Sequence, residues 1–209
     1  FKNTVIDTLE LSRTLDQGFA RHSLSALVKR YNVPFDEDSH HRADYDAEGT
    51  ALVFSKMIKK LVGQNYETIA DLDKLISKDE IHKFGRTYHF NALALNREGL
   101  KNLFKIISLA NTTYFHKTPR ILRSKLNELR DGLLIGSGCY ESEVFKEARS
   151  KEGQELTNII NFYDYVEVQP PEVYNHLIQT SDFGSEIEIQ NHIRKVVEST
   201  KESGKIIVA

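Results

Sequence analysis

The chain has 209 residues, of which 40% are hydrophobic and 28% are charged. It holds 28 Lys and Arg against 30 Asp and Glu, and this balance excludes the overall basic excess typical of an autonomous nucleic-acid binder. A single cysteine, Cys139, excludes an internal disulfide framework and favours a reducing, cytoplasmic location. No apolar run approaches the roughly 20 residues of a membrane span, so no membrane partner is expected.

Residues 1–82 are predicted to be mostly helical. Their apolar residues recur three or four positions apart, which is the spacing of one helix face. Small polar residues suited to capping precede the first helices, and Gly63 can end the longest one. The predicted helices are 9–15 after Asp7, one after Ser23, 44–62, and 66–76 with Ile69, Leu72 and Ile76 inward.

Residues 83–209 alternate between short apolar runs and amphipathic helices, which predicts parallel βα units. The helix after Asn96 is expected to turn Leu100, Leu103, Phe104, Ile107 and Ala110 inward. The predicted strands are 88–95, 133–135, 165–168 and 206–208. Four strands are too few for a closed barrel of about eight, so this part is predicted to be a segment of a βα barrel. The chain as a whole is therefore placed in the α/β class.

His41 precedes Asp46 by five residues, at the start of the long predicted helix. If both residues were helical, their side chains would point roughly 140° apart, so they can share a site only if residues 40–44 form a loop. A loop imidazole over a helical carboxylate suits a site that combines a metal ion with a base. His40 is an adjacent rival for the base. Asp46 is also explained, without any site, as a carboxylate that stabilises a helix start.

His41, Ala43 and Asp46 resemble the third motif, H-x-A-x-x-D, of the DEDDh (DnaQ-like) 3′–5′ exonucleases. Further blocks resemble the PolC-type bacterial DNA polymerase III alpha subunits, which carry this exonuclease inserted within a PHP domain. The blocks are 5–13, 40–51, 88–90, 99–103, 132–139 and 162–172. The resemblance implies the C-terminal part of a ribonuclease-H-like exonuclease domain over 1–82. Part of a PHP-type βα barrel would follow over 83–209.

For the exonuclease part, the resemblance implies that Asp46 is a metal ligand and His41 is the general base. The expected cofactor is Mg²⁺ or Mn²⁺, held by hard oxygen ligands, and histidine suits the base because its pKa lies near working pH. Two-metal hydrolysis needs several carboxylates. The family's early Asp-x-Glu pair and middle aspartate are not found in a matching context upstream of Asp46. We therefore expect this chain alone to be inactive.

For the PHP part, the resemblance makes Cys139 and His89 candidate ligands of Zn²⁺, Fe or Mn²⁺. Cys139 follows a predicted strand, at the end where βα barrels place their sites, although a small buried residue would fit there as well. His89 lies near the start of its predicted strand, away from that end, and a core histidine is the rival interpretation. Glu143 and Glu167 are possible site-lining carboxylates; a helix-dipole partner and a polar barrel-interior residue are the alternatives.

The function implied is part of a replicative DNA polymerase that extends DNA and removes mismatched 3′ ends. Its partners would be the primer–template 3′ end of DNA and, through a longer parent protein, other replisome subunits such as the sliding clamp. The chain starts at Phe1 rather than Met, so we expect it to be a piece of that protein. The alternatives are a non-catalytic scaffold or interaction remnant, and a free-standing PHP-type metal-dependent phosphoesterase.

Overall fold

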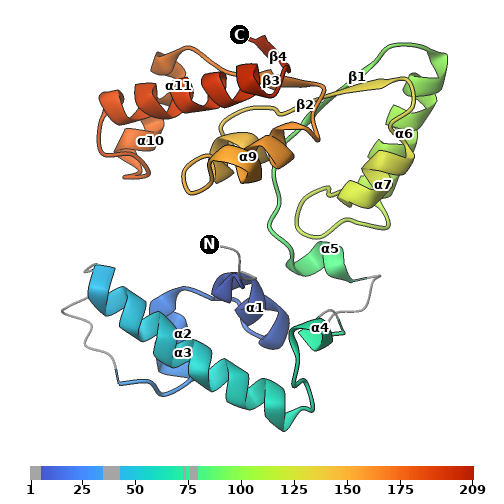
Figure 1. The fold of residues 1–209 in the computed structure, drawn as a ribbon. Coiled ribbons are helices and arrows are strands. Elements are labelled where there is room, and N and C mark those ends of the chain that lie inside the picture. Colours follow the sequence, from blue (N-terminus) through green and yellow to red (C-terminus); the bar gives the residue numbers. More distant parts are fainter. Residues whose placement is uncertain (1–5, 35–42, 73, 76–79) are drawn as a thin grey trace. The chain divides into compact units, whose positions relative to one another are not determined.

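The computed structural model describes residues 6–34, 43–72, 74–75 and 80–209. The chain divides into two compact units, Phe1–Arg86 and Thr87–Ala209, and each is described by itself (Figure 1). His40 and His41 lie outside the described residues. The domain boundary predicted at residue 82 stays a prediction. Within the described part of the chain, no helix is long and apolar enough to cross a membrane.

The first unit is helical, as predicted. Its helices are α1 (Thr8–Leu15), α2 (Leu24–Arg30), α3 (Ala43–Gly63), α4 (Ile69–Leu72) and α5 (Ile81–Phe84). The predicted caps are confirmed, because the Asp7 carboxylate accepts hydrogen bonds from two backbone N–H groups of α1 and Ser23 Oγ accepts one from α2. These bonds satisfy donors that have no partner inside the helix.

The helix predicted over 66–76 is wrong in extent, because α4 has four residues. Asp71 reaches back to accept hydrogen bonds from the backbone N–H and the hydroxyl of Thr68, which fixes the helix start at Ile69. Ile69 is 57% exposed rather than inward, whereas Leu72 packs against the core of the unit. Ile76 lies outside the described residues.

The core of the first unit lies between α3 and the pair α1 and α2. The buried side of α3 repeats every four residues, at Gly49, Val53, Met57 and Leu61, which is one face of a helix. Met57 is completely buried. The same core cluster contains residues from α1, α2 and the turn after α2: Leu11, Leu27, Val28 and Val33.

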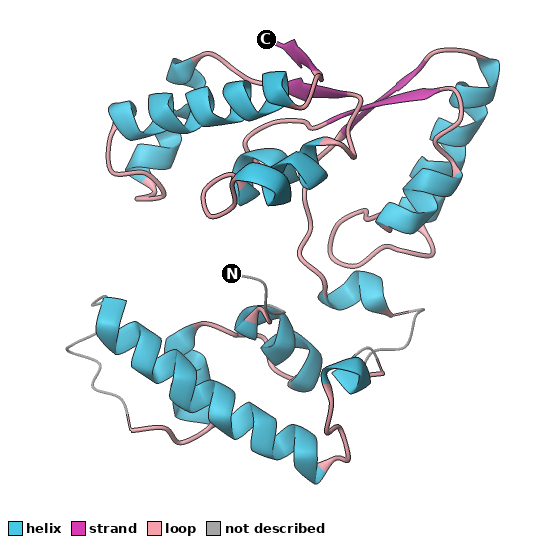
Figure 2. Cartoon of the chain, viewed as in Figure 1, coloured by secondary structure: helices cyan, strands magenta, loops and turns pink. Residues whose placement is uncertain are grey.

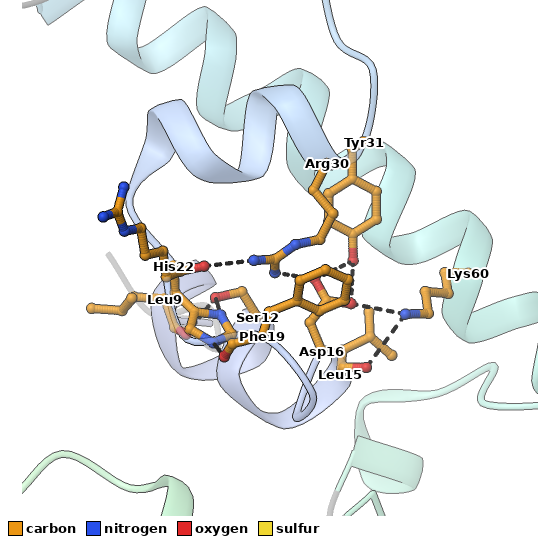
Figure 3. A network of polar contacts seen from close by, with 10 residues as sticks. Leu9, Ser12, Leu15, Asp16, Phe19, His22, Arg30, Tyr31 and Lys60 are labelled. Atoms are coloured by element: carbon orange, nitrogen blue, oxygen red, sulfur yellow. Dashed lines mark hydrogen bonds and ion pairs between the residues drawn. The ribbon is translucent and has the colours of Figure 1, made fainter.

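A buried carboxylate joins these helices through ion pairs and hydrogen bonds (Figure 3). Asp16 caps the end of α1, and its side chain is 1% exposed. Its two oxygens lie 2.7 Å from Arg30 Nη1 and 2.8 Å from Lys60 Nζ, and both accept from the Tyr31 hydroxyl at 3.1 Å. Burial by itself raises the pKa of Asp16, but the hydrogen bonds from Lys60 and Arg30 outweigh it and hold the pKa below its usual value. Asp16 is therefore charged, with partners on α2, α3 and the residue after α2.

The second unit contains a sheet with strand order β1 (Asn91–Ala94), β2 (Leu133–Gly136), β3 (Tyr165–Glu167), β4 (Ile206–Val208). β2, β3 and β4 run parallel to one another, as predicted for βα units. β1 runs antiparallel to β2, so the prediction of uniformly parallel strands was wrong.

The connection between β1 and β2 explains this reversal. The chain leaves β1 into α6 (Arg97–Asn111) and returns through α7 (Arg123–Glu128) to the end that it left (Figure 1). The N–H of Leu95 donates to the Gly132 carbonyl at 2.9 Å, and a Cβ on Gly99 would lie 1.8 Å from that same oxygen. The start of α6 is therefore held against the start of β2, and β2 runs back along β1.

The inward face predicted for α6 is only partly right. Ala110 is buried and Leu103 packs against the core, but Leu100, Phe104 and Ile107 are 45%, 63% and 49% exposed. The buried residues of α6 are Gly99, Asn102, Ile106 and Ala110. The cause is polar and steric, because the Asn102 side chain donates to the Asp131 carbonyl at 2.9 Å and Gly99 allows close approach. Both contacts turn the glycine side of the helix inward.

One face of the sheet is covered by helices. Ile135 and Val166 on this face are 0% and 1% exposed, and they share a core with α8 (Glu143–Glu147), α9 (Gly153–Ile160) and α11 (Glu186–Glu202). Figure 2 shows α9 and α11 beside the strands. η2 (Pro171–Tyr174) and α10 (Asn175–Gln179) add a second cluster around Phe145. Because strand residues alternate between faces, Gly136, Tyr165 and Glu167 lie on the other face.

Candidate metal centre at the carboxyl edge of the sheet

The carboxyl edge of the sheet is formed by residues 137–139 after β2, by Glu167 at the end of β3, and by the beginning of β1. β1 reaches this edge with its amino-terminal end because it is antiparallel to β2, with Asn91 opposite Gly136. The expectation that His89 lies away from the site end was therefore wrong. The strand predicted over 88–95 is present but shorter, as β1 covers only Asn91–Ala94, and its predicted parallel direction was wrong.

His89 and Cys139 are in contact at this edge, with His89 Nδ1 3.3 Å from Cys139 Sγ. Gly138 makes the approach possible, because it has a φ of +83° and a Cβ there would lie 3.3 Å from the Cα of Phe90. The N–H of His89 donates to the Glu141 carbonyl at 3.1 Å. The structure thus brings together the two residues that the resemblance singled out in this unit.

The pair is accessible from solvent. His89 is exposed and Cys139 is half-buried, so neither the core-histidine nor the buried-cysteine interpretation is right. Tyr174 lies nearby and is 1% exposed. Burial raises the pKa of Tyr174, a hydrogen bond from the Gln169 N–H lowers it, and negative charge on Cys139 raises it.

The donor set fits one side of a metal site. Imidazole nitrogen and thiolate sulfur are the two ligand types that zinc prefers. Two such ligands, about 2.1 Å and 2.3 Å from a tetrahedral zinc ion, lie about 3.6 Å from each other. The separation of 3.3 Å between His89 Nδ1 and Cys139 Sγ is close to that value. Among the described residues, no group of three or more His, Cys, Asp or Glu residues is placed to hold a metal ion. The described part of the chain therefore supplies half of a tetrahedral set.

Glu143 and Glu167 differ in what they contact. Glu143 lies in the first turn of α8, pairs with Arg123 and accepts a hydrogen bond from the Tyr163 hydroxyl at 3.0 Å, which are structural contacts. Glu167 instead lies at the carboxyl edge, where it accepts a hydrogen bond from Asn91 Nδ2 at 2.5 Å.

Asn91, Ser137 and Tyr165 contact Glu167, and the sequence analysis missed all three. The N–H of Glu167 donates to Ser137 Oγ at 2.9 Å, and the Tyr165 hydroxyl is hydrogen-bonded to the Glu167 carboxylate. Burial raises the pKa of Tyr165, and the charge on Glu167 raises it further. A signal for Asn91 was present in the sequence, because it is a polar residue two positions after His89 in a mostly apolar predicted strand, and side chains two apart lie on the same face.

Asp46 belongs to the first unit and lies in the first turn of α3. It lines a cavity of about 680 Å³. The other lining residues are small or apolar: Ile6, Thr8, Ala43, Ala47, Thr50, Ala51 and Phe54. A carboxylate at the wall of such a cavity can hold a cation beside an apolar group. The pairing of Asp46 with His41 lies outside the described residues and stays a prediction.

Comparison with known families gives the context of both sites. Residues 42–192 match the model of the PHP domain. The chain belongs to the PHP domain family. Residues 1–54 match the model of an exonuclease. The two matches overlap, so they do not locate the boundary between the domains. PHP and exonuclease domains both imply dependence on divalent metals.

Relatives of this PHP-domain chain are named DNA polymerase III PolC-type. The relative from Bacillus subtilis (strain 168) is 41% identical over 208 residues, which are 100% of this chain and 14% of the relative. The relative from Staphylococcus saprophyticus is 44% identical over 176 residues, covering 84% of this chain and 12% of the relative. This chain therefore spans a small part of the length of the relatives that it matches. The similarity confirms the predicted family, and the two matched models confirm the fold class.

Proposed function

We propose that this chain is a segment of a replicative, PolC-type DNA polymerase that extends DNA and proofreads its 3′ ends. The observation that carries the proposal is one continuous similarity, 41% over 208 residues, to a relative with that name. The substrate would be the primer–template 3′ end, and the replisome partners, such as the sliding clamp, would act through the longer polymerase in the cytoplasm. The segment would contribute the end of the exonuclease and part of the PHP domain.

In the exonuclease site, Asp46 would hold Mg²⁺ or Mn²⁺, which supplies charge stabilisation during phosphodiester hydrolysis. His41 would accept the proton of the attacking water. Support comes from the place of Asp46 at the wall of a pocket of about 680 Å³, in the unit that contains the whole exonuclease match. The lining residues from Ala47 to Phe54 are small or apolar, so Asp46 would be the charged group among the described lining residues.

A segment exchange tests this role. The purified chain is expected to release no nucleotides from DNA 3′ ends. The same residues placed in the matching segment of the Bacillus subtilis relative are expected to support metal-dependent release. Asp46→Ala in that chimera should lower the rate by about 10²-fold or more, because it removes a ligand that positions the metal.

Glu48→Ala provides the matched control, because this carboxylate is exposed on the same helix and is expected to leave the rate unchanged. A chimera that polymerises DNA but never removes 3′ nucleotides would favour the alternative that this segment is a non-catalytic scaffold. Metal-dependent release by the isolated chain, lost with Asp46→Ala, would contradict the prediction that the chain alone is inactive.

In the PHP site, we propose that His89 and Cys139 are ligands of Zn²⁺, Fe or Mn²⁺. Co²⁺ reports on this directly, since a cobalt–thiolate bond gives a charge-transfer absorption and Cys139 is the chain's single cysteine. Titration of the purified chain with Co²⁺ is expected to produce that absorption, Cys139→Ala to abolish it, and His89→Ala to raise the Kd about tenfold or more.

Binding of Co²⁺ that is unaffected by Cys139→Ala would contradict the assignment of the thiolate. His22→Ala is the control for the histidine, because this side chain belongs to the first unit, where it is hydrogen-bonded to Ser12 Oγ and the Phe19 carbonyl, and should not alter the absorption.

A further inference from the structure

Glu167 is the point at which three strand ends are tied together. Its carboxylate accepts from Asn91 Nδ2 of β1 at 2.5 Å, and its own N–H donates to Ser137 Oγ, just after β2, at 2.9 Å. It is itself the last residue of β3. One residue therefore links the start of β1 to the ends of β2 and β3. We call Asn91, Ser137 and Glu167 the strand-end clamp.

The sequence leaves room for this clamp on the middle strand. Gly136 is opposite both Asn91 and Tyr165, and a Cβ on Gly136 would lie 2.3 Å from Cζ of the Tyr165 ring. The ring thus occupies the space above the glycine, and its hydroxyl is hydrogen-bonded to Glu167. The link from β1 to β3 therefore crosses β2 at a residue that has no side chain of its own.

The clamp lies close to both proposed ligands along the chain, and Glu167 contacts its other two members. Asn91 is two residues after His89, and Ser137 is two residues before Cys139. Both ligands lie just beyond the paired residues, because the β1–β2 pairing ends at Asn91 and Gly136. There, outside the β1–β2 ladder, His89 is held by an isolated parallel bridge to Ser142, with its N–H donating to the Glu141 carbonyl at 3.1 Å. The clamp adds side-chain contacts to this single backbone bridge. The Ser137 hydroxyl is 0% exposed and takes the place of a backbone acceptor for the Glu167 N–H.

We propose that the strand-end clamp sets the separation between His89 and Cys139 and thereby the affinity of this edge for a divalent metal. Asn91, Ser137 and Glu167 are positioning residues and do not touch the metal. Contacts that orient ligands in this way commonly change metal affinity 10- to 100-fold. This inference rests on the metal site proposed for the PHP part of the chain.

Co²⁺ titration of the purified chain tests the clamp. Glu167→Ala is expected to raise the Kd about tenfold or more while the thiolate–cobalt absorption at saturation remains. Asn91→Ala should do the same, because it breaks the same link from the other side. Glu167→Gln keeps an oxygen that accepts from Asn91 Nδ2 and is expected to stay within about threefold of the unmodified chain.

The outcomes are distinguishable. No thiolate–cobalt absorption in the unmodified chain would overturn the metal site and the clamp together. Absorption that is lost in Cys139→Ala but is unchanged in affinity by both Glu167→Ala and Asn91→Ala would overturn the clamp alone. A Kd for Glu167→Gln as high as that of Glu167→Ala would show that the charge of Glu167, not its hydrogen bond to Asn91, is responsible, and would also overturn the clamp.

Glu198→Ala, which removes an exposed carboxylate of α11, is the control variant. Thermal melting of every variant separates lost affinity from lost folding.

Discussion

Asp16→Ala is expected to lower the free energy of unfolding of the first unit by about 3–5 kcal/mol. The carboxylate is buried and charged, and it is paired with Arg30 and Lys60 (Figure 3). Its removal leaves the Arg30 guanidinium, whose side chain is 13% exposed, without its carboxylate partner in a poorly solvated place. Urea unfolding followed by circular dichroism measures the loss. Hydrogen exchange of peptides from α1, α2 and α3 shows whether the loss lies in this unit.

The matched control is Glu80→Ala in the same unit. Glu80 pairs with Lys83 at 2.7 Å, but the two side chains are 48% and 37% exposed, so water screens the pair. Its loss is expected to leave the free energy of unfolding nearly unchanged. Equal effects of Asp16→Ala and Glu80→Ala would contradict the role given to the buried carboxylate.

Gly132→Ala is expected to destabilise the second unit by about 3 kcal/mol. Gly132 has a φ of +72°, and a left-handed backbone costs a residue with a Cβ about 1–2 kcal/mol. The new Cβ would also lie 2.5 Å from Asn96 Oδ1 and 2.6 Å from the backbone nitrogen of Gly99, and such overlap costs about 1–3 kcal/mol. Urea unfolding and exchange of peptides from α6 and β2 measure the effect.

Gly153→Ala separates the two costs. Gly153 has a φ of +55° and nothing within 4 Å of the added Cβ, so it carries the backbone cost without the overlap. The expected loss is about 1–2 kcal/mol. If Gly132→Ala costs no more than Gly153→Ala, the close contact between α6 and β2 does not hold β1 in its antiparallel direction.

Predictions from the sequence were correct for helix caps and strands, because these depend mainly on residues close together in the chain. Asp7, Ser23 and Asn96 were placed as helix caps, and each side chain accepts hydrogen bonds from backbone N–H groups of its helix. The four strands were placed because apolar runs bounded by turn residues need no distant partner to be recognised. The helix predicted over 66–76 failed for a local reason as well, since the Asp71 side chain starts the helix three residues later.

The periodicity of apolar residues alone did not predict which side of a helix faces the core. The apolar stripe Leu100, Phe104 and Ile107 predicted one orientation of α6, but the contact of Gly99 with Gly132 and the hydrogen bond from Asn102 to Asp131 chose another. Glycine and asparagine carry little weight in a hydrophobic pattern. Their effect depends on which backbone atoms lie opposite them, and those atoms are about 30 residues away in the sequence.

The sequence by itself indicated the family, the four strands, the longer helices and the candidate ligands, because motifs and periodicities are written in neighbouring residues. The short elements α5, η2 and α10 were not predicted. Tertiary structure alone decided that β1 reverses direction, and this reversal places His89 beside Cys139. It also decided that Asn91 and Ser137 meet at Glu167. The physical reason is that strand direction and cross-strand hydrogen bonds depend on how the intervening helices return the chain, which short-range pattern does not encode.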